Sequence, residues 1–153
     1  MSNSPHPEIK TLEYNKITDN IYIGTNQCCQ IDFDDMLIKE GMTYDISLEK
    51  DRVDAPYGVV SYVWIPVEDH QAPTQEQLGF GVYVLEKIVL LGKKVYVHCK
   101  NGHGRAPTLV AAYLIKKGKT VEEAVVFIKQ MRPVIHLEDI QKKALENFLK
   151  NIK

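Results

Sequence analysis

The chain has 153 residues, the usual size of one folding domain. Hydrophobic residues make up 44% and charged residues 25% of it, so a single core can form without disulfide or metal support. Nineteen Lys and Arg against twenty Asp and Glu leave a net charge of −1, which excludes a general basic surface for nucleic acid or an anionic membrane. No apolar run reaches the roughly 20 residues of a membrane-spanning helix. We expect a monomeric, cytoplasmic domain over residues 11–153, without a stable membrane anchor, after a flexible N-terminal tail at residues 1–10.

The three cysteines include an adjacent pair, Cys28 and Cys29. An odd number of cysteines with this spacing does not fit a disulfide framework. The sequence therefore favours a reducing compartment, and we interpret the adjacent pair as semi-buried residues without a catalytic role, with a redox role as the alternative.

The first half of the chain predicts three strands and one helix. Three β-rich runs predict strands at residues 21–23, 44–48 and 59–67. The last of these lacks clean alternation, which is typical of a strand covered on both faces. A helix is expected at residues 32–40, where Phe33, Met36 and Leu37 share one face and Gly41 follows as a stop.

The second half of the chain predicts four helices and a fourth strand. Thr74 and Thr120 each open a capping box, and helices are expected to end at Gly92, Gly118 and Pro133. The apolar faces of three of these helices are, in chain order, Leu78, Val82, Leu85 and Val89; Val121, Ala124, Val125, Ile128 and Met131; and Ile140, Leu145, Phe148, Leu149 and Ile152. The strand, residues 94–98, is followed by a loop and a helix with Pro107 in its first turn. Strands alternating with helices indicate an α/β sheet covered on both sides.

The loop from Cys99 to Arg105 carries the residues best suited to chemistry. Ligands of open α/β sheets bind beyond the carboxyl ends of strands, where a loop meets a helix N-terminus. Gly102 and Gly104 permit a tight ring whose backbone N–H groups can surround a tetrahedral anion, and Arg105 can hold two phosphate oxygens at once. These groups favour the thiolate form of Cys99, which would be a nucleophile aligned with a bound phosphate without any metal or cofactor. A structural, buried cysteine is the alternative interpretation.

The segment from His98 to Arg105 resembles the His-Cys-x5-Arg signature of the protein tyrosine phosphatase superfamily, and the short chain is similar to its compact dual-specificity branch. The resemblance implies a single α/β domain with a central, mostly parallel sheet of about five strands flanked by helices. It also implies a phosphocysteine intermediate with Cys99 as nucleophile and Arg105 as phosphate clamp. The implied phosphate cradle consists of Lys100, Asn101, Gly102, His103, Gly104 and Arg105.

The same resemblance implies a general acid on a loop upstream of the signature, and Asp69 matches that position. Glu68 is the alternative acid. His98 is expected to support the loop through hydrogen bonds to nearby backbone. Gln141 corresponds to a water-positioning glutamine of some relatives, with a plain surface glutamine as the alternative.

One position departs from the common pattern. Most relatives have Ser or Thr after the arginine, and this chain has Ala106. The sequence from Arg105 to Pro107 resembles the phosphatases of regenerating liver, which implies slow hydrolysis of the phosphocysteine. The C-terminal prenylation box of those relatives is absent, so their membrane association is not expected here.

The resemblance favours a phosphoprotein substrate carrying phosphotyrosine or phosphoserine/threonine. Lys100 and His103 are similar to the basic residues of phosphoinositide-dephosphorylating relatives, so a phosphoinositide or another phosphorylated small molecule is the alternative substrate. His70 and His136 are interpreted as ordinary surface histidines. The rival functions are a phosphate-binding pseudophosphatase and a sulfurtransferase of the rhodanese type, which also uses a loop cysteine.

Overall fold

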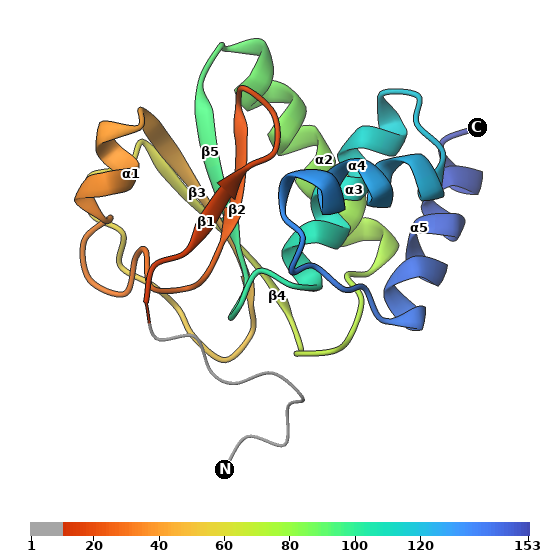
Figure 1. Cartoon of the computed structure of the whole chain (residues 1–153), viewed down its shortest axis with the longest axis horizontal. Helices are drawn as coiled ribbons and strands as arrows, with labels where there is room; N and C mark the ends of the chain where they lie inside the picture. The colour runs from red at the N-terminus through yellow and green to blue at the C-terminus, as the bar shows by residue number, and fades with distance from the viewer. Residues whose placement is uncertain (1–10) are drawn as a thin grey trace.

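A computed structural model describes residues 11–153 of the chain, and the tail predicted at residues 1–10 lies outside the described residues. Its centre is a five-stranded sheet in the order β1-β2-β5-β3-β4 (Figure 1). The strands are β1 (Tyr14–Lys16), β2 (Ile21–Gly24), β3 (Met42–Glu49), β4 (Ser61–Val67) and β5 (Lys94–His98). All neighbouring strands are parallel except β1, which pairs with β2 in antiparallel fashion. The mostly parallel sheet of the predicted fold class is confirmed.

The helices cover both faces of this sheet. They are α1 (Asp35–Lys39), α2 (Gln75–Leu90), α3 (Arg105–Lys116), α4 (Val121–Met131) and α5 (Asp139–Asn151). Helices α2 to α5 lie on one side and α1 lies on the other (Figure 1). Helix α3 is central on its side, because its residues from Arg105 to Ile115 are buried without interruption. None of the helices in residues 11–153 has the length and apolar character to cross a membrane.

The local signals for helix ends behave as predicted. Thr74 and Thr120 form complete capping boxes with Gln77 and Glu123. The residues Gly41, Gly92 and Gly118 follow helix ends with positive φ angles, a conformation that glycine adopts without steric cost. The chain's turns are therefore encoded locally.

Some burial predictions and one helix boundary are wrong. The strand predicted to be covered on both faces is the edge strand β4, where Trp64 is 41% exposed and only Ile65 and Val67 are buried. Met36, Met131 and Ile140 are also exposed, because the elements packed against each helix cover only part of its apolar face. The first helix begins at Asp35 after its N-cap Asp34, rather than at residue 32.

The parallel strands place four loops at one edge of the sheet. The carboxyl-terminal residues Gly24 and His98 are paired in register, and Ser47 pairs with His98 from the other side. The loops that follow β2, β3, β4 and β5 therefore meet at this edge, as parallel topology requires. The signature loop follows β5, and Asp69 follows β4.

Candidate active site

The signature loop closes into a ring between β5 and α3. Cys99 follows the last residue of β5 and is 3% exposed, and Gly104 is the N-cap of α3. Gly102 has a φ of +69°, and a Cβ atom there would lie 2.6 Å from the carbonyl oxygen of Gly24. Only glycine fits that contact and that backbone conformation, so the ring packs directly against the end of β2.

Arg105 is held in position by the end of strand β4. Its guanidinium is buried, with Nη1 donating a hydrogen bond to the carbonyl oxygen of Val67 at 2.8 Å. Its Nη2 lies 3.4 Å from Oδ1 of Asp69. Nη1 of the guanidinium is thus anchored to β4, and Nη2 faces the loop that carries the predicted acid.

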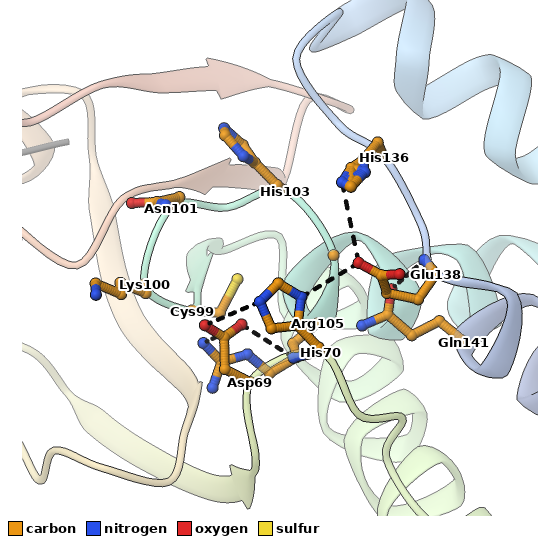
Figure 2. Close-up of a pocket in the computed structure, with 11 residues that line it drawn as sticks. Asp69, His70, Cys99, Lys100, Asn101, His103, Arg105, His136, Glu138 and Gln141 are labelled. Atoms are coloured by element: carbon orange, nitrogen blue, oxygen red, sulfur yellow. Dashed lines mark hydrogen bonds and ion pairs between the residues drawn. The ribbon is translucent and has the colours of Figure 1, made fainter. Parts of the chain in front are cut away.

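A pocket at this edge brings most of the predicted site residues together (Figure 2). Its lining consists of Asp69, His70, Cys99, Lys100, Asn101, His103, Gly104, Arg105, His136, Glu138 and Gln141. Gly102 is not in the lining because it faces β2, and His98 is buried behind the ring. The predicted nucleophile, clamp and acid share this pocket.

The two candidate acids have different surroundings. The carboxylate of Glu68 pairs with Lys50 at 2.9 Å, outside the pocket, and this ion pair lowers the pKa of Glu68. Asp69 lines the pocket beside Arg105, and its Oδ1 accepts a hydrogen bond from the backbone N–H of His70. Geometry therefore favours Asp69 as the group that meets a substrate.

Two histidines that the sequence suggested were ordinary surface residues line the pocket. The Nδ1 atom of His70 lies 3.2 Å from Oε1 of Glu138, and Nε2 of the same ring lies 3.7 Å from Asp69. His136 is 4.0 Å from that Glu138 oxygen, and its backbone N–H donates to the carbonyl of His103. No spacing rule links residues 70 and 136 to the signature, so only the fold brings them there.

Gln141 ties the acid loop to helix α5. It is 1% exposed, so the alternative of a plain surface glutamine is wrong. Its Nε2 donates to the carbonyl of Gln71, and its Oε1 accepts from the backbone N–H of Glu138. The side chain thereby fixes the loop that follows Asp69.

Arg132, at the C-cap of α4, is a site residue that the sequence reasoning missed. Its side chain is fully buried and donates from Nε to Gly102 O at 2.9 Å and from Nη2 to Asn101 O at 2.8 Å. Nη1 donates to Asn15. With these carbonyls held outward, the backbone N–H groups of the ring are free to face its centre. A lone arginine before Pro133 gave no sequence signal for this role.

His98 makes different contacts from those predicted. Its Nε2 lies 3.0 Å from Asp45, 3.3 Å from Sγ of Cys29 and 3.7 Å from Asp54, and Nδ1 has no hydrogen-bond partner among residues 11–153. The predicted hydrogen bonds to backbone are therefore wrong, because carboxylates and a sulfur atom from neighbouring elements occupy the positions next to Nε2 of the His98 imidazole. Burial alone would lower the pKa of His98, but Asp45 and Asp54 outweigh it and raise the pKa.

The adjacent cysteines are more deeply placed than the sequence suggested. Cys28 and Cys29 are each 2% exposed and are joined in a disulfide. Cys99 is the free cysteine of the described residues. The loop after β2 folds back against β5, so the pair is buried beside His98 instead of being a semi-buried bystander.

Taken together, a buried thiol within a glycine-containing ring, a buried arginine and a helix N-terminus define a cysteine-phosphatase type of site. The family model "Dual specificity phosphatase, catalytic domain" matches residues 21–151. The chain belongs to the dual-specificity phosphatase family.

Curated relatives and solved structures support this assignment. Phosphatidylglycerophosphate phosphatase PTPMT2 of Arabidopsis thaliana is 38% identical over 91 residues, covering 58% of this chain and 40% of that protein. Human phosphatidylglycerophosphatase and protein-tyrosine phosphatase 1 is 46% identical over 81 residues, covering 52% of this chain and 40% of that protein. The alignments thus span about two fifths of these relatives. The crystal structure of PTPMT1 in complex with PI(5)P superposes with a TM-score of 0.78 at 28% identity, over 91% of this chain and 96% of that one.

Proposed function

We propose that this chain hydrolyses phosphate monoesters through a phosphocysteine and that its substrate is the phosphorylated headgroup of a glycerophospholipid. The observation that carries the proposal is the convergence of Cys99, Arg105 and Asp69 on one pocket (Figure 2). A sulfurtransferase needs no upstream carboxylate, so this arrangement favours phosphate chemistry.

In the first step, the Cys99 thiolate attacks phosphorus and the bond to the ester oxygen breaks. Protonated Asp69 donates its proton to that leaving oxygen, as general acid catalysis requires. Arg105 and the backbone N–H groups of the ring hold the three remaining phosphoryl oxygens and stabilise their charge in the transition state. Arg132 keeps those N–H groups aligned through its bonds to Asn101 and Gly102.

In the second step, the Asp69 carboxylate takes a proton from water, and the water oxygen attacks the phosphorus of the phosphocysteine. The sulfur leaves as a thiolate and inorganic phosphate is released. The side chain of Ala106 offers no hydroxyl to the departing sulfur, so this step is expected to limit turnover.

Two observations favour a lipid phosphate over a phosphoprotein as the substrate. The relatives named above are phosphatidylglycerophosphatases, and Lys100 together with three histidines lines the pocket. The Lys100 ammonium and the N–H groups of the imidazoles would attract a second phosphate of a headgroup such as that of phosphatidylglycerophosphate. Phosphotyrosine is the second candidate, because the human relative is also named a protein-tyrosine phosphatase.

The test compares substrates on the full chain. Phosphatidylglycerophosphate in detergent micelles, a phosphotyrosine peptide and an aryl phosphate are assayed for phosphate release, with Cys99→Ser as control. We expect kcat/KM for the lipid to exceed that for the peptide by at least about tenfold, equal to 1.4 kcal/mol in transition-state stabilisation. A faster peptide would refute the lipid assignment, and activity retained in Cys99→Ser would refute the phosphocysteine. No hydrolysis of any substrate would favour a pseudophosphatase.

A further inference from the structure

A second group of chemically reactive side chains lies behind the phosphate ring. Cys28 and Cys29 from the loop after β2, Asp45 from β3 and His98 from β5 each offer one ligand atom, and these four atoms lie within 4.8 Å of one another. All four residues are buried. None of the four lines the active-site pocket, so the phosphatase mechanism leaves this cluster unused.

The donor set suits a borderline-soft divalent cation. Two thiolates, an imidazole and a carboxylate are all zinc ligands, and structural zinc sites are four-coordinate and closed. With metal–ligand bonds of about 2.0–2.3 Å, the ligand atoms of a tetrahedral site are about 3.3–3.8 Å apart. Nε2 of His98 already lies 3.0 Å from Asp45 and 3.3 Å from Cys29, close to those separations, and the two sulfur atoms can move apart once their disulfide is reduced.

A second observation points to a missing positive charge. Oδ1 of Asp45 has the ring of His98 at 3.0 Å as its one charged neighbour, and Oδ2 has no hydrogen-bond partner within the described residues, although the side chain is fully buried. Its neighbouring carboxylates are compensated, since Asp54 pairs with Arg52 and Glu49 accepts from Asn26. Asp45 has only the ring of His98 nearby. A buried carboxylate oxygen without a hydrogen bond is costly, and a bound cation would reduce that cost.

We propose that, in its reduced form, this chain binds one Zn²⁺-like divalent cation through Cys28, Cys29, Asp45 and His98. A dithiol reductant first transfers two electrons and two protons to the Cys28–Cys29 disulfide and is itself oxidised to a disulfide. The two thiols then lose their protons to solvent as two metal–sulfur bonds form, as metal–thiolate binding requires. Both cysteine side chains already point to one side of the loop because they are bonded to each other.

The surface offers a route to this site. Residues 26–35, which include both cysteines, line a surface cavity whose lining residues are separate from those of the active-site pocket. A cation entering there reaches the sulfur atoms first and the imidazole behind them. Once bound, the cation would join the loop after β2, strand β3 and the end of β5, directly next to Cys99.

The experiment titrates the reduced full chain with Cd²⁺ and with Co²⁺ in the Cys99→Ser background, which removes the other thiol. Excess dithiol is removed under anaerobic conditions before the titration. We expect one equivalent to bind, with sulfur-to-metal charge-transfer absorption and the intense visible bands of tetrahedral Co²⁺. The oxidised protein should show neither signal. These readouts do not depend on phosphatase activity, so they stand apart from a failure of the proposed function.

Variants separate the proposed ligands from their neighbours. Cys28→Ser/Cys29→Ser should abolish the charge-transfer signal, and Asp45→Asn should keep it but weaken binding at least about tenfold. Glu49→Gln is the matched control, because it alters another buried carboxylate of β3 outside the ligand set and should bind normally. Circular dichroism checks that each variant folds, and single Cys28→Ala and Cys29→Ala variants serve if the double variant does not. Binding that persists without both thiols, equal losses in Asp45→Asn and Glu49→Gln, or no binding by the reduced protein would overturn the proposal.

Discussion

Replacing Arg132 with methionine should destabilise the fold and disorder the phosphate ring together. The substitution keeps an unbranched apolar stem but removes hydrogen bonds to the carbonyl oxygens of Gly102 and Asn101. Charge-assisted hydrogen bonds contribute about 1.5–3 kcal/mol each, so these two account for about 3–6 kcal/mol. Burial lowers the pKa of Arg132, which indicates that the guanidinium lost hydration on folding, and its removal returns part of that cost. We expect a net loss of about 3–5 kcal/mol in the free energy of unfolding.

Urea denaturation followed by circular dichroism measures this loss, and vanadate affinity reports the state of the ring. Lys143→Met is the control, because it removes one positive charge from an exposed position of helix α5. We expect the control to change stability by less than about 1 kcal/mol. A loss of less than about 1 kcal/mol in Arg132→Met together with normal vanadate binding would show that the carbonyl contacts do not organise the ring.

Three further predictions concern the catalytic carboxylate, the missing hydroxyl and the buried histidine. Asp69→Asn should lower kcat on alkyl phosphates by about 10²–10⁴, whereas Glu68→Gln should change it little; a larger loss in the second variant would reassign the acid. Ala106→Ser should raise steady-state turnover by about tenfold to a hundredfold and diminish a rapid-mixing burst of aryl alcohol. The reason is that a charge-assisted hydrogen bond from the serine hydroxyl, worth about 1.5–3 kcal/mol, would stabilise the departing thiolate. No burst in the wild type and no gain in the variant would contradict this. In metal-free protein, the free energy of unfolding should fall as pH rises through the folded-state pKa of His98, since Asp45 outweighs burial and raises that pKa. This stabilisation is complete below the unfolded-state pKa and is lost above the folded-state pKa; a denaturation series in which Asp45→Asn keeps the same pH slope would exclude His98 as its source.

The sequence by itself determined the elements whose causes are local. Capping boxes at Thr74 and Thr120 and the glycines after helices depend on contacts within a few residues, so they fixed the helix limits before any packing was known. The ring from Cys99 to Arg105 is also a continuous segment, and its chemistry follows from its own residues. The acid at Asp69 required the family resemblance, because spacing alone did not separate it from Glu68.

Only the tertiary structure decided which distant side chains meet around the carboxyl end of β5. Arg132 reaches the ring from α4, His70 and His136 reach the pocket from two other loops, and the cysteine pair reaches His98 from the loop after β2. These contacts join segments far apart in the chain, and no local pattern encodes them. The exposure of Met36, which the sequence placed on an apolar helix face, was also decided by tertiary structure. Periodicity gives a helix an apolar face, but the elements packed against the helix decide how much of that face is covered.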